Sequence, residues 1–436
     1  MKILVLGNDG RSHALVWKLF ASPAADVLVA PGNGGACQIA PQVDLDPLQP
    51  AQVAQWAFSE QIDLIVPAGS EPLWAGLVDE VVSMHIGVCG ASQRSTRIEW
   101  SRCYAKELLL RYQLPTPAGR CFASLPMAEK YLAAQPLPVV LRGDHPAAGE
   151  GVYHDRYAAL EALRALFVSR PVEGSSHGVV IEEYVSGPVV SFSAITDGSH
   201  LVPLLPARIY DGMGPQPDSP PAPGMGAITG NSTYAQKLKA YLERHLMQPL
   251  VAAIAREQLP YWGIIGVDCV IGAQGPRITG LRCSLRDMEA QAVLPRLIDD
   301  LVPYFEAAIA RSLHRLPPLR WRDEASVALA LVTQGYPHHY PINAAVEGIS
   351  EVDEGVLVFH DQTESPYILR YDPARRDRLL GGGSGGLYLT GGHVLTVVAL
   401  GATLAGARGR ALINAERIRF PGRIYRDDVG ASEQTP

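Results

Sequence analysis

The 436-residue sequence has few cysteines and no long apolar run, and each shortage excludes a class of protein. The six cysteines form no CxxC pair and no cysteine–histidine group with zinc-like spacing, which excludes a disulfide-rich scaffold and a zinc finger. Several cysteines lie inside apolar runs, where we expect free, buried thiols. The start MKILVLGNDG is too short for a secretory signal, and no apolar run reaches spanning length. These absences favour a reduced, cytoplasmic protein.

Charge is also scarce. Charged residues make up 19% of the chain and hydrophobic residues 47%, a balance that predicts folded domains rather than disorder. The net charge of −7 argues against nucleic acid or an anionic membrane as the main partner. Lysine occurs six times and arginine 31 times, so arginine fills most basic positions. The length favours about three domains.

Strand and helix patterns alternate over residues 1 to about 100, which predicts a parallel sheet with helices on both faces. An amphipathic helix in WSRCYAKELLLRYQLPTP leads into a second domain, expected at 101–312, with a smaller lid subdomain at about 115–192. A proline-rich linker follows, and the third domain is expected at 320–436. We expect the GGGSGG stretch at 381–386 to be flexible.

Two glycine-rich loops follow the first two predicted strands. They are GNDGRSHAL, at 7–15, and PGNGGA, at 31–36. Glycine lets the backbone approach a ligand closely, and the start of the following helix favours an anion. The spacing differs from GxGxxG, so a dinucleotide is not expected. Either loop alone would read as an ordinary tight turn, but adjacent strand ends favour a pocket for phosphate or ribose.

Three further stretches carry candidate chemistry. VVLRGDHPAAGEGV, at 139–152, has a strand and then a small-residue loop of the kind that closes over phosphates, yet it carries Glu150. VIEEYVSG could bind an adenine edge or could be a solvated strand edge. The hairpin GVDCVIGAQGPRITGLRCS offers Asp268 as a magnesium ligand, but its second strand supplies no carboxylate. An inert hairpin is an equally good interpretation.

In this order the motifs resemble those of the phosphoribosylamine–glycine ligase family of the ATP-grasp superfamily, over nearly the whole chain. LVLGNDGRSHAL is similar to the family's GNGGREHAL, APGNGG to PGNAGT, and IDLIVPAGSEPL to the stretch ending GPEAPL. PVVLRGDHPAAGEGV resembles PxVIKADGLAAGKGV, and VIEEYVSG resembles IEEFLxG. Near the end, GYP, VFH, TGGHVLTVVALGATLAGARGRA and RDDVG resemble GYP, VFHAGT, TxGGRVLxVTALGxTxxEAxxRAY and RxDIG.

The resemblance implies an α/β protein with the ATP-grasp fold, an N-terminal Rossmann-like parallel-sheet domain and a C-terminal α+β domain. It implies that ATP phosphorylates the glycine carboxylate and that the amine of phosphoribosylamine attacks the resulting acyl phosphate, with Mg²⁺ as cofactor. We therefore expect a phosphoribosyl ligand at Gly7, Asn8, Gly10, Arg11, His13, Gly32 and Asn33. We expect ATP at Arg102, Arg142, Glu182, Glu183 and Val185, catalytic roles for Arg282 and Asp287, and a metal ligand in Asp268.

The chain departs from the family pattern at charged positions. Lysines of the pattern are replaced by Arg102 and Arg142, which keep the charge but differ in shape. The lysine of the GKG loop is Glu150, a reversal of charge beside polyphosphate. The pair of metal ligands in EFNCRFGDPE aligns with Gly280 and Arg282. Arg282 could itself neutralise a phosphate.

Three hypotheses follow. The chain is a working ligase that makes glycinamide ribonucleotide, or a paralogue with weak or lost activity, a pseudoenzyme, that keeps the phosphoribosyl crevice. The third hypothesis is an ATP-grasp enzyme redirected to another amine or acid, with the loop at 211–226 shaping a new pocket. The departures from the family pattern favour the second hypothesis, a pseudoenzyme. The oligomeric state and any protein partner are not encoded in these motifs.

Overall fold

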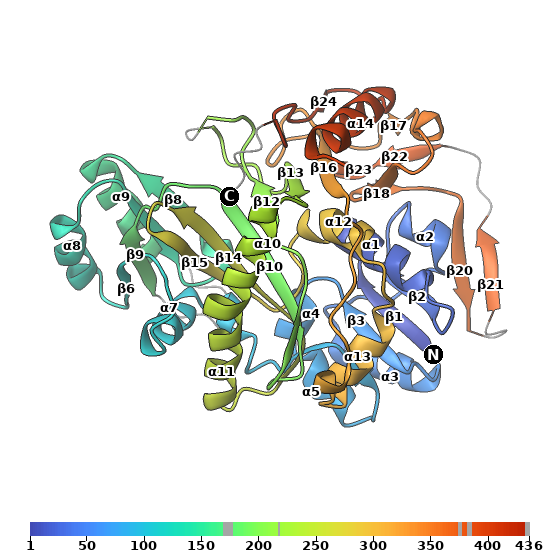
Figure 1. Cartoon of the computed structure of the whole chain (residues 1–436), viewed down its shortest axis with the longest axis horizontal. Helices are drawn as coiled ribbons and strands as arrows, with labels where there is room; N and C mark the ends of the chain where they lie inside the picture. Colours follow the sequence, from blue (N-terminus) through green and yellow to red (C-terminus); the bar gives the residue numbers. More distant parts are fainter. Residues whose placement is uncertain (169–177, 217–218, 374–376, 382–385, 432–436) are drawn as a thin grey trace.

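The computed structural model describes residues 1–168, 178–216, 219–373, 377–381 and 386–431. Figure 1 shows a lid at the left, an N-terminal domain in blue, and a C-terminal domain in orange and red. Most of the predicted flexible stretch at 381–386 lies outside the described residues.

The N-terminal domain is built on a parallel sheet of order β2-β1-β3-β4, as the sequence predicted. Short apolar runs that end at glycine or proline give strands whose middle residues are buried, the pattern expected of a sheet covered on both faces. The strands are β1 (Lys2–Gly7), β2 (Asp26–Pro31), β3 (Leu64–Pro67) and β4 (Gly87–Val88). The helices are α1 (Gly10–Phe20), α2 (Ala36–Ile39), α3 (Pro50–Ser59), α4 (Glu71–Trp74) and α5 (Leu77–Val82).

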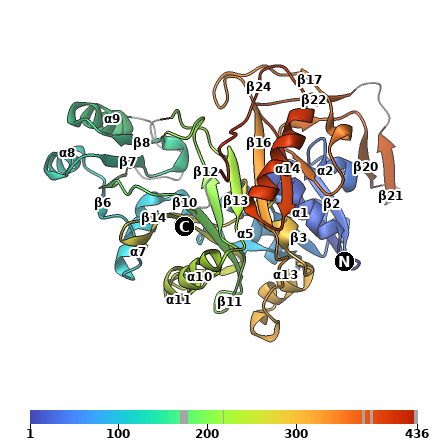
Figure 2. The ribbon, with the colours of Figure 1, turned by 45° about the horizontal axis from the view of Figure 1, so that its top comes forward.

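The lid is a four-stranded antiparallel sheet of order β6-β9-β7-β8 with two helices, α8 and α9, packed against it (Figure 2). Its own apolar core includes Leu132, Leu141, Leu163 and Ile181. Its elements are β6 (Gly119–Phe122), α8 (Leu125–Ala134), β7 (Val139–Gly143), a 3₁₀ turn (Pro146–Ala148), β8 (Glu150–Tyr153), α9 (Arg156–Val168) and β9 (Val179–Glu183). The short strand β5 (Gly90–Ala91) and the helices α6 (Arg97–Trp100) and α7 (Arg102–Arg111) lead into it.

A large sheet forms the centre of the molecule, with a main path of order β15-β14-β10-β12-β13-β16-β23-β18. The C-terminal domain was predicted as a third unit, but its strands continue this sheet through the antiparallel pair β13–β16. All nine residues of β16 are buried, so this strand needs partners on both edges and cover on both faces. Because β13 and β16 lie about 100 residues apart in the chain, no pattern among neighbouring residues predicts their pairing.

The strands of the central and C-terminal parts are bounded as follows: β10 (Val189–Thr196), β11 (Leu201–Pro203), β12 (Ala207–Tyr210), β13 (Gly226–Thr229), β14 (Tyr261–Gly272), β15 (Gly275–Arg282), β16 (Ala325–Thr333), β17 (Ala345–Val346), β18 (Leu357–His360), β19 (Thr363–Glu364), β20 (Ile368–Asp372), β21 (Asp377–Gly381), β22 (Leu387–Leu389), β23 (His393–Gly401) and β24 (Arg423–Ile424).

The remaining helices are α10 (Thr233–Leu242), α11 (Gln248–Arg256), α12 (Glu289–Val293), α13 (Val302–Ile309) and α14 (Leu404–Arg417). The helices α10 and α11 are joined by a π-helical turn at Glu243–Met247, two residues before Pro249, whose ring removes one backbone donor.

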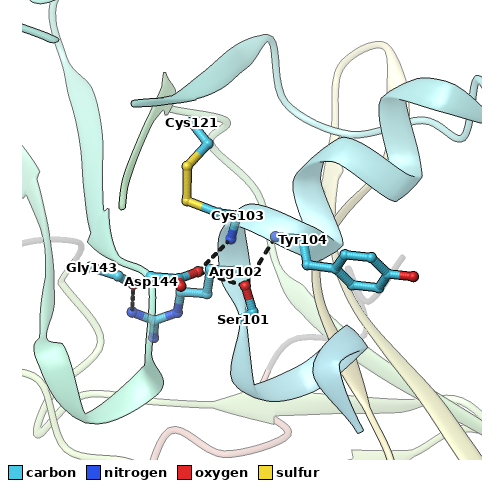
Figure 3. Close-up of a disulfide and its surroundings, with 7 residues drawn as sticks. All are labelled: Ser101, Arg102, Cys103, Tyr104, Cys121, Gly143 and Asp144. Atoms are coloured by element: carbon cyan, nitrogen blue, oxygen red, sulfur yellow. Dashed lines mark hydrogen bonds between the residues drawn. A yellow bond between two sulfur atoms is a disulfide. The ribbon is translucent and has the colours of Figure 1, made fainter. Parts of the chain in front are cut away.

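The expectation of free thiols is confirmed at four cysteines and wrong at two. Cys37, Cys89, Cys269 and Cys283 are free and buried. Cys103 and Cys121 form a disulfide between the start of α7 and β6, with their Cα atoms 5.3 Å apart (Figure 3). The pair is separated by 18 residues, so only the packing of α7 against β6 reveals it.

Within the described ranges, no helix combines the length and the apolar character that crossing a bilayer requires.

Candidate active site

A cavity of about 450 Å³ lies where the lid, the N-terminal domain and the β14–β15 hairpin meet. Basic and acidic side chains from all three parts line it. The basic set is Arg11, Arg102, Lys106, Arg142, Arg282 and Arg286, and the acidic set is Glu71, Glu99, Glu150, Glu182, Asp211 and Asp268. Such a mixture of convergent charges suits a charged, phosphorylated ligand better than an apolar one.

Two arginines of the cavity point at the lid loop. Ser101 caps α7 by accepting from the Tyr104 backbone N–H, which fixes Arg102 at the first helical position. Arg102 Nη2 lies 2.9 Å from Glu150 Oε2, and Arg142 Nε on β7 lies 3.4 Å from the same oxygen. Burial acts to raise the pKa of Glu150, but Arg142 and Arg102 hold it below its ordinary value. The carboxylate of Glu150 therefore occupies an anion's place between both arginines.

Behind these arginines, Lys106 and Glu182 form a buried ion pair. Lys106 Nζ lies 2.8 Å from Glu182 Oε2, and both side chains are only 4% exposed. Arg142 Nη1 lies 3.4 Å from the other oxygen of Glu182. Lys106 was not among the predicted site residues, although it stands four residues after Arg102 on one face of α7.

Two predicted nucleotide residues lie near this pair but outside the cavity lining. Glu183 accepts a hydrogen bond from the Ala118 backbone N–H at 2.9 Å, which ties β9 to the segment before β6. Val185 follows β9 and approaches Gly272 of β14. Neither side chain is among the described residues that line the cavity.

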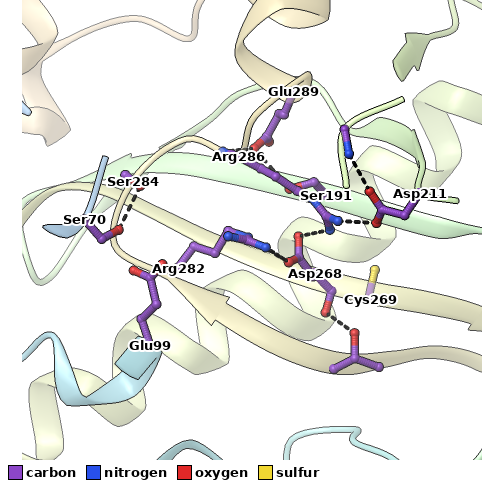
Figure 4. A network of polar contacts seen from close by, with 12 residues as sticks. Ser70, Glu99, Ser191, Asp211, Asp268, Cys269, Arg282, Ser284, Arg286 and Glu289 are labelled. Carbon is purple, nitrogen blue, oxygen red and sulfur yellow. Dashed lines mark hydrogen bonds and ion pairs between the residues drawn. The ribbon is translucent and has the colours of Figure 1, made fainter. Parts of the chain in front are cut away.

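Asp268 on β14 is held by two guanidinium groups (Figure 4). Arg282 Nη2 lies 2.7 Å from its Oδ2, and Arg286 Nη1 lies 3.0 Å from its Oδ1. Arg286 also pairs with Asp211. Burial acts to raise the pKa of Asp268, but Arg282 and Arg286 hold it well below its ordinary value. No signal in the sequence singled out Arg286.

The residues present do not fit a magnesium ion at this position. Mg²⁺ in a nucleotide site needs one or two carboxylates whose oxygens are free for the ion. Both oxygens of Asp268 face arginine, and its partner in the strand register is Gly280, which has no side chain. Glu289 is fully buried, where Oε2 accepts from Ser191 and Ser193 at 3.0 and 2.9 Å, so Oε1 is its single oxygen without a partner among the described residues. Arginine thus holds the place that a cation would need.

The first glycine-rich loop reaches the same cavity through Arg11. Asp9 caps α1 by accepting from the Ser12 backbone N–H, and its carboxylate lies 2.6 Å from Arg11 Nη2. Gly7 ends β1, and Asn8 is exposed at the tip of the loop. Arg11 is the one member of the predicted phosphoribosyl set that lines this cavity among the described residues.

The second glycine-rich loop borders a different cavity of about 500 Å³, which Gly32 and Asn33 line together with Thr363, Ser365 and Arg370. The two loops adjoin as predicted, since the Gly32 N–H donates to Gly7 O at 3.0 Å. Asn33 is buried, and its amide donates to His360 O at 2.8 Å and to Asn8 O at 3.2 Å. Asn33 therefore holds the loops together and ties them to the C-terminal domain.

His13 and Gly10 also contact the C-terminal domain. His13 Nδ1 accepts from the His360 backbone N–H at 2.8 Å, and the Gly10 N–H donates to Asp361 Oδ2 at 2.9 Å. Burial lowers the pKa of His13 well below its ordinary value. Burial, together with the neighbouring Asp287 and Asp9, raises the pKa of Asp361 to about 7. The predicted crevice is thus a junction between domains.

Comparisons with known proteins match each part of this architecture. Family models for the N domain, the ATP-grasp (A) domain and the C domain of phosphoribosylglycinamide synthetase match residues 1–99, 100–290 and 326–432. The chain belongs to this family. The expected ATP-grasp fold with an N-terminal parallel sheet is confirmed.

Named relatives are similar over their full length. Phosphoribosylamine–glycine ligases from Agrobacterium fabrum and Rhodopirellula baltica are 31% and 32% identical, covering 99% and 98% of this chain and 98% and 96% of theirs. The phosphoribosylamine–glycine ligase structure from Thermotoga maritima has a TM-score of 0.79 at 23% identity, covering 98% of this chain and all of that one. A biotin carboxylase domain from Hydrogenobacter thermophilus, solved with MgADP and bicarbonate, has a TM-score of 0.68 at 12% identity over 97% of this chain and 91% of that one.

Proposed function

We propose that this chain is an ATP-dependent carboxylate–amine ligase that joins the carboxylate of glycine, or of a related small acid, to a phosphoribosyl amine. Membership of the family and the names of its full-length relatives support this reaction. One observation carries the proposal. Arg11 belongs to the phosphoribosyl loop and lines the cavity where Arg102 and Arg142 meet, so both halves of the reaction share one space.

Arginine side chains form the nucleotide-binding half of the proposed site. Arg102 and Arg142 project from two different elements toward the carboxylate of Glu150. Each guanidinium can donate hydrogen bonds to two phosphate oxygens at once. Lys106 stays behind them in its ion pair with Glu182, and the other oxygen of Glu182 orients Arg142. ATP, when bound, supplies the phosphoryl group that activates the carboxylate.

In the rest of the cavity, arginine side chains supply the positive charge. Arg282 and Arg286 converge on Asp268 and line the same cavity, where they can neutralise the developing negative charge of a transferring phosphoryl group. Guanidinium groups held by ion pairs are preorganised donors, because they need little rearrangement on binding. The proposed ligase thus depends on arginine where the residues do not fit magnesium.

A second candidate is a paralogue that binds a phosphoribosyl ligand with weak or no turnover. The specific observation is Glu150, whose carboxylate fills the anion position between Arg102 and Arg142. A bound polyphosphate must displace it. In this candidate the glycine-rich loops still bind a phosphoribosyl ligand, although the reaction with ATP is weak or lost.

An ADP-release assay separates the two candidates. Purified protein is given ATP with glycine and phosphoribosylamine, then with each co-substrate omitted, in Mg²⁺ and in EDTA. The ligase predicts ADP release that requires both co-substrates and falls less than about tenfold without Mg²⁺. Saturable binding of ribose 5-phosphate by calorimetry, with no ADP release in any mixture, would favour the second candidate.

Substitution of Arg11 checks the shared space. Arg11→Gln should weaken ribose 5-phosphate binding and lower ADP release together. Arg164→Gln is the matched control, since Arg164 pairs with Glu129 and Glu161 on the lid surface, away from the cavity lining. Equal effects of both substitutions would contradict the proposed role of Arg11.

A further inference from the structure

Three side chains from separate parts of the chain converge at the junction of the domains. Asp287 precedes α12, Asp361 follows β18, and His393 begins β23. His393 Nδ1 lies 3.5 Å from Asp287 Oδ2 and 3.6 Å from Asp361 Oδ2, and one ligand atom from each residue lies within 4.8 Å of the others. Asp361 and His393 are each 5% exposed.

We propose that these three residues form a binding site for a divalent first-row transition metal, of which Zn²⁺ and Mn²⁺ are the closest matches. Metal–ligand bonds of about 2.1 Å to atoms 3.5 to 3.6 Å apart subtend about 115° at the ion, which both tetrahedral and wider coordination accommodate. An imidazole beside two carboxylates selects these ions over Ca²⁺ and Mg²⁺.

A divalent cation would stabilise the ionised form of the site. With both carboxylates ionised and the imidazole neutral, the three side chains carry a formal charge of −2, which is costly to bury unless it is compensated. Arg11, a nearby cation, is engaged with Asp9. A divalent ion matches the charge of Asp287 and Asp361.

A buried amide next to the cluster has an oxygen without a partner. Gln291 is fully buried, and its Nε2 donates to Asp287 Oδ1 at 2.7 Å. A Cβ atom on Gly10 would lie 2.4 Å from the Gln291 amide nitrogen and 3.1 Å from Asp361 Oδ2, so the amide end reaches the cluster. Among the described residues, Gln291 Oε1 has no hydrogen-bond partner, and a water bound to the ion would supply one.

The position suggests what the ion does. Asp287 is 31% exposed, which leaves one side of the cluster open for a water or an oxygen of a ligand. The Gly10 N–H donates to Asp361, so the site also ties the phosphoribosyl loop to the C-terminal domain. The family patterns VFHAGT and GGRVL have alanine and arginine where this chain has Asp361 and His393.

Metal content and affinity test the site. Protein stripped with EDTA is dialysed against Zn²⁺ or Mn²⁺ and analysed by mass spectrometry for bound metal per chain. We expect one equivalent in the unmodified protein and at least a tenfold weaker affinity in Asp361→Asn and His393→Gln. Less than 0.2 equivalent in the unmodified protein would overturn the proposal.

Two controls locate the ion. His314→Ala removes a second acidic–histidine cluster, Asp197, His200 and His314, in which Asp197 is already bonded to the backbone N–H groups of its own turn. Asp268→Asn alters the nucleotide cavity. Retention of metal in both controls is expected, and its loss in either one, with retention in Asp361→Asn, would overturn the assignment.

X-ray absorption on the metal-loaded, unmodified protein keeps the test decisive if the substitutions unfold the chain. We expect a first shell of nitrogen and oxygen atoms with the scattering signature of one imidazole. A shell of oxygen atoms alone would place the ion elsewhere and exclude His393. This proposal does not depend on ligase activity, so it can fail independently of the proposed function.

Discussion

At the scale of single residues, the cavity differs from an ordinary polyphosphate site in the sign of one charge. Glu150 is 53% exposed, so it can leave the cavity at modest cost, while Arg102 and Arg142 are each 19% exposed. Pairs that include such an exposed carboxylate contribute little to stability. Glu150 therefore acts on ligand binding more than on folding.

The substitution Glu150→Gln should strengthen ATP binding. It removes the competing carboxylate and frees both arginines, so we expect affinity to rise about two- to fivefold, equivalent to about 0.5–1 kcal/mol. Isothermal titration calorimetry measures the change. Glu161→Gln is the matched control, since Glu161 is 52% exposed and pairs with Arg164 on the same lid. Unchanged affinity in Glu150→Gln would show that Glu150 does not occupy the ligand's place.

At the scale of elements, the lid is fastened to α7 by more than its sheet. The side chain of Asp144, directly after β7, connects this strand to α7, since the Cys103 backbone N–H donates to Asp144 Oδ1 at 2.9 Å. Ser101 Oγ donates to the same oxygen at 2.8 Å (Figure 3). The disulfide to Cys121 adds a covalent tie between α7 and β6.

The double substitution of Cys103 and Cys121 by serine should loosen the lid. A cross-link that closes a loop of this length stabilises by about 3 kcal/mol, mainly by restricting the unfolded chain. We expect faster hydrogen exchange in β6 and β7 and little change in the N-terminal sheet, measured by mass spectrometry. Adding dithiothreitol to the unmodified protein should reproduce the effect, and adding it to the double variant should change nothing. Equal exchange in all four samples would contradict a stabilising cross-link.

At the scale of the whole molecule, buried aromatic and imidazole rings form part of the junction between the N-terminal and C-terminal domains. His13 stacks edge-on with Phe359, with ring centroids 5.4 Å apart, and its Nδ1 accepts from the His360 N–H. That acceptor is lost when His13 takes up a proton. The junction is therefore built for a neutral imidazole.

The junction should weaken in acid. His13 has a pKa near 6.5 in the unfolded chain and a much lower one when folded, so the unfolded state binds the proton first. Its contribution to the free energy of unfolding is fully present above about pH 6.5 and is lost as pH falls toward the folded pKa, by up to about 1.4 kcal/mol per pH unit.

His13→Asn tests this dependence, because the amide oxygen can still accept from His360 but does not titrate. We expect the variant to be less stable than the unmodified protein at pH 7.5, by on the order of 1–2 kcal/mol, and the gap to narrow toward pH 5. Urea unfolding at each pH measures it. The exposed His154→Asn should show a constant difference, and a constant gap for His13→Asn would contradict the argument.

The sequence determined much of this protein because its signals are local. Apolar runs such as LVLG and LIVP specify buried parallel strands, and the glycines of the first two loops specify the turns that follow β1 and β2. The ordered motifs identified the family over the whole chain. They also placed Arg102, Arg142 and Asp268 in one region, where the structure brings all three into a single cavity.

Only the tertiary structure decided which charges meet. Arg286 pairs with Asp268 and Asp211 across strands that the sequence does not link, and Cys103 reaches Cys121 only once α7 packs on β6. The convergence of Asp287, Asp361 and His393 likewise joins positions that lie 32 to 106 residues apart in the chain. Local propensity fixes strands and turns through neighbouring residues, whereas ion pairs and ligand sets depend on distances that only the packed chain defines.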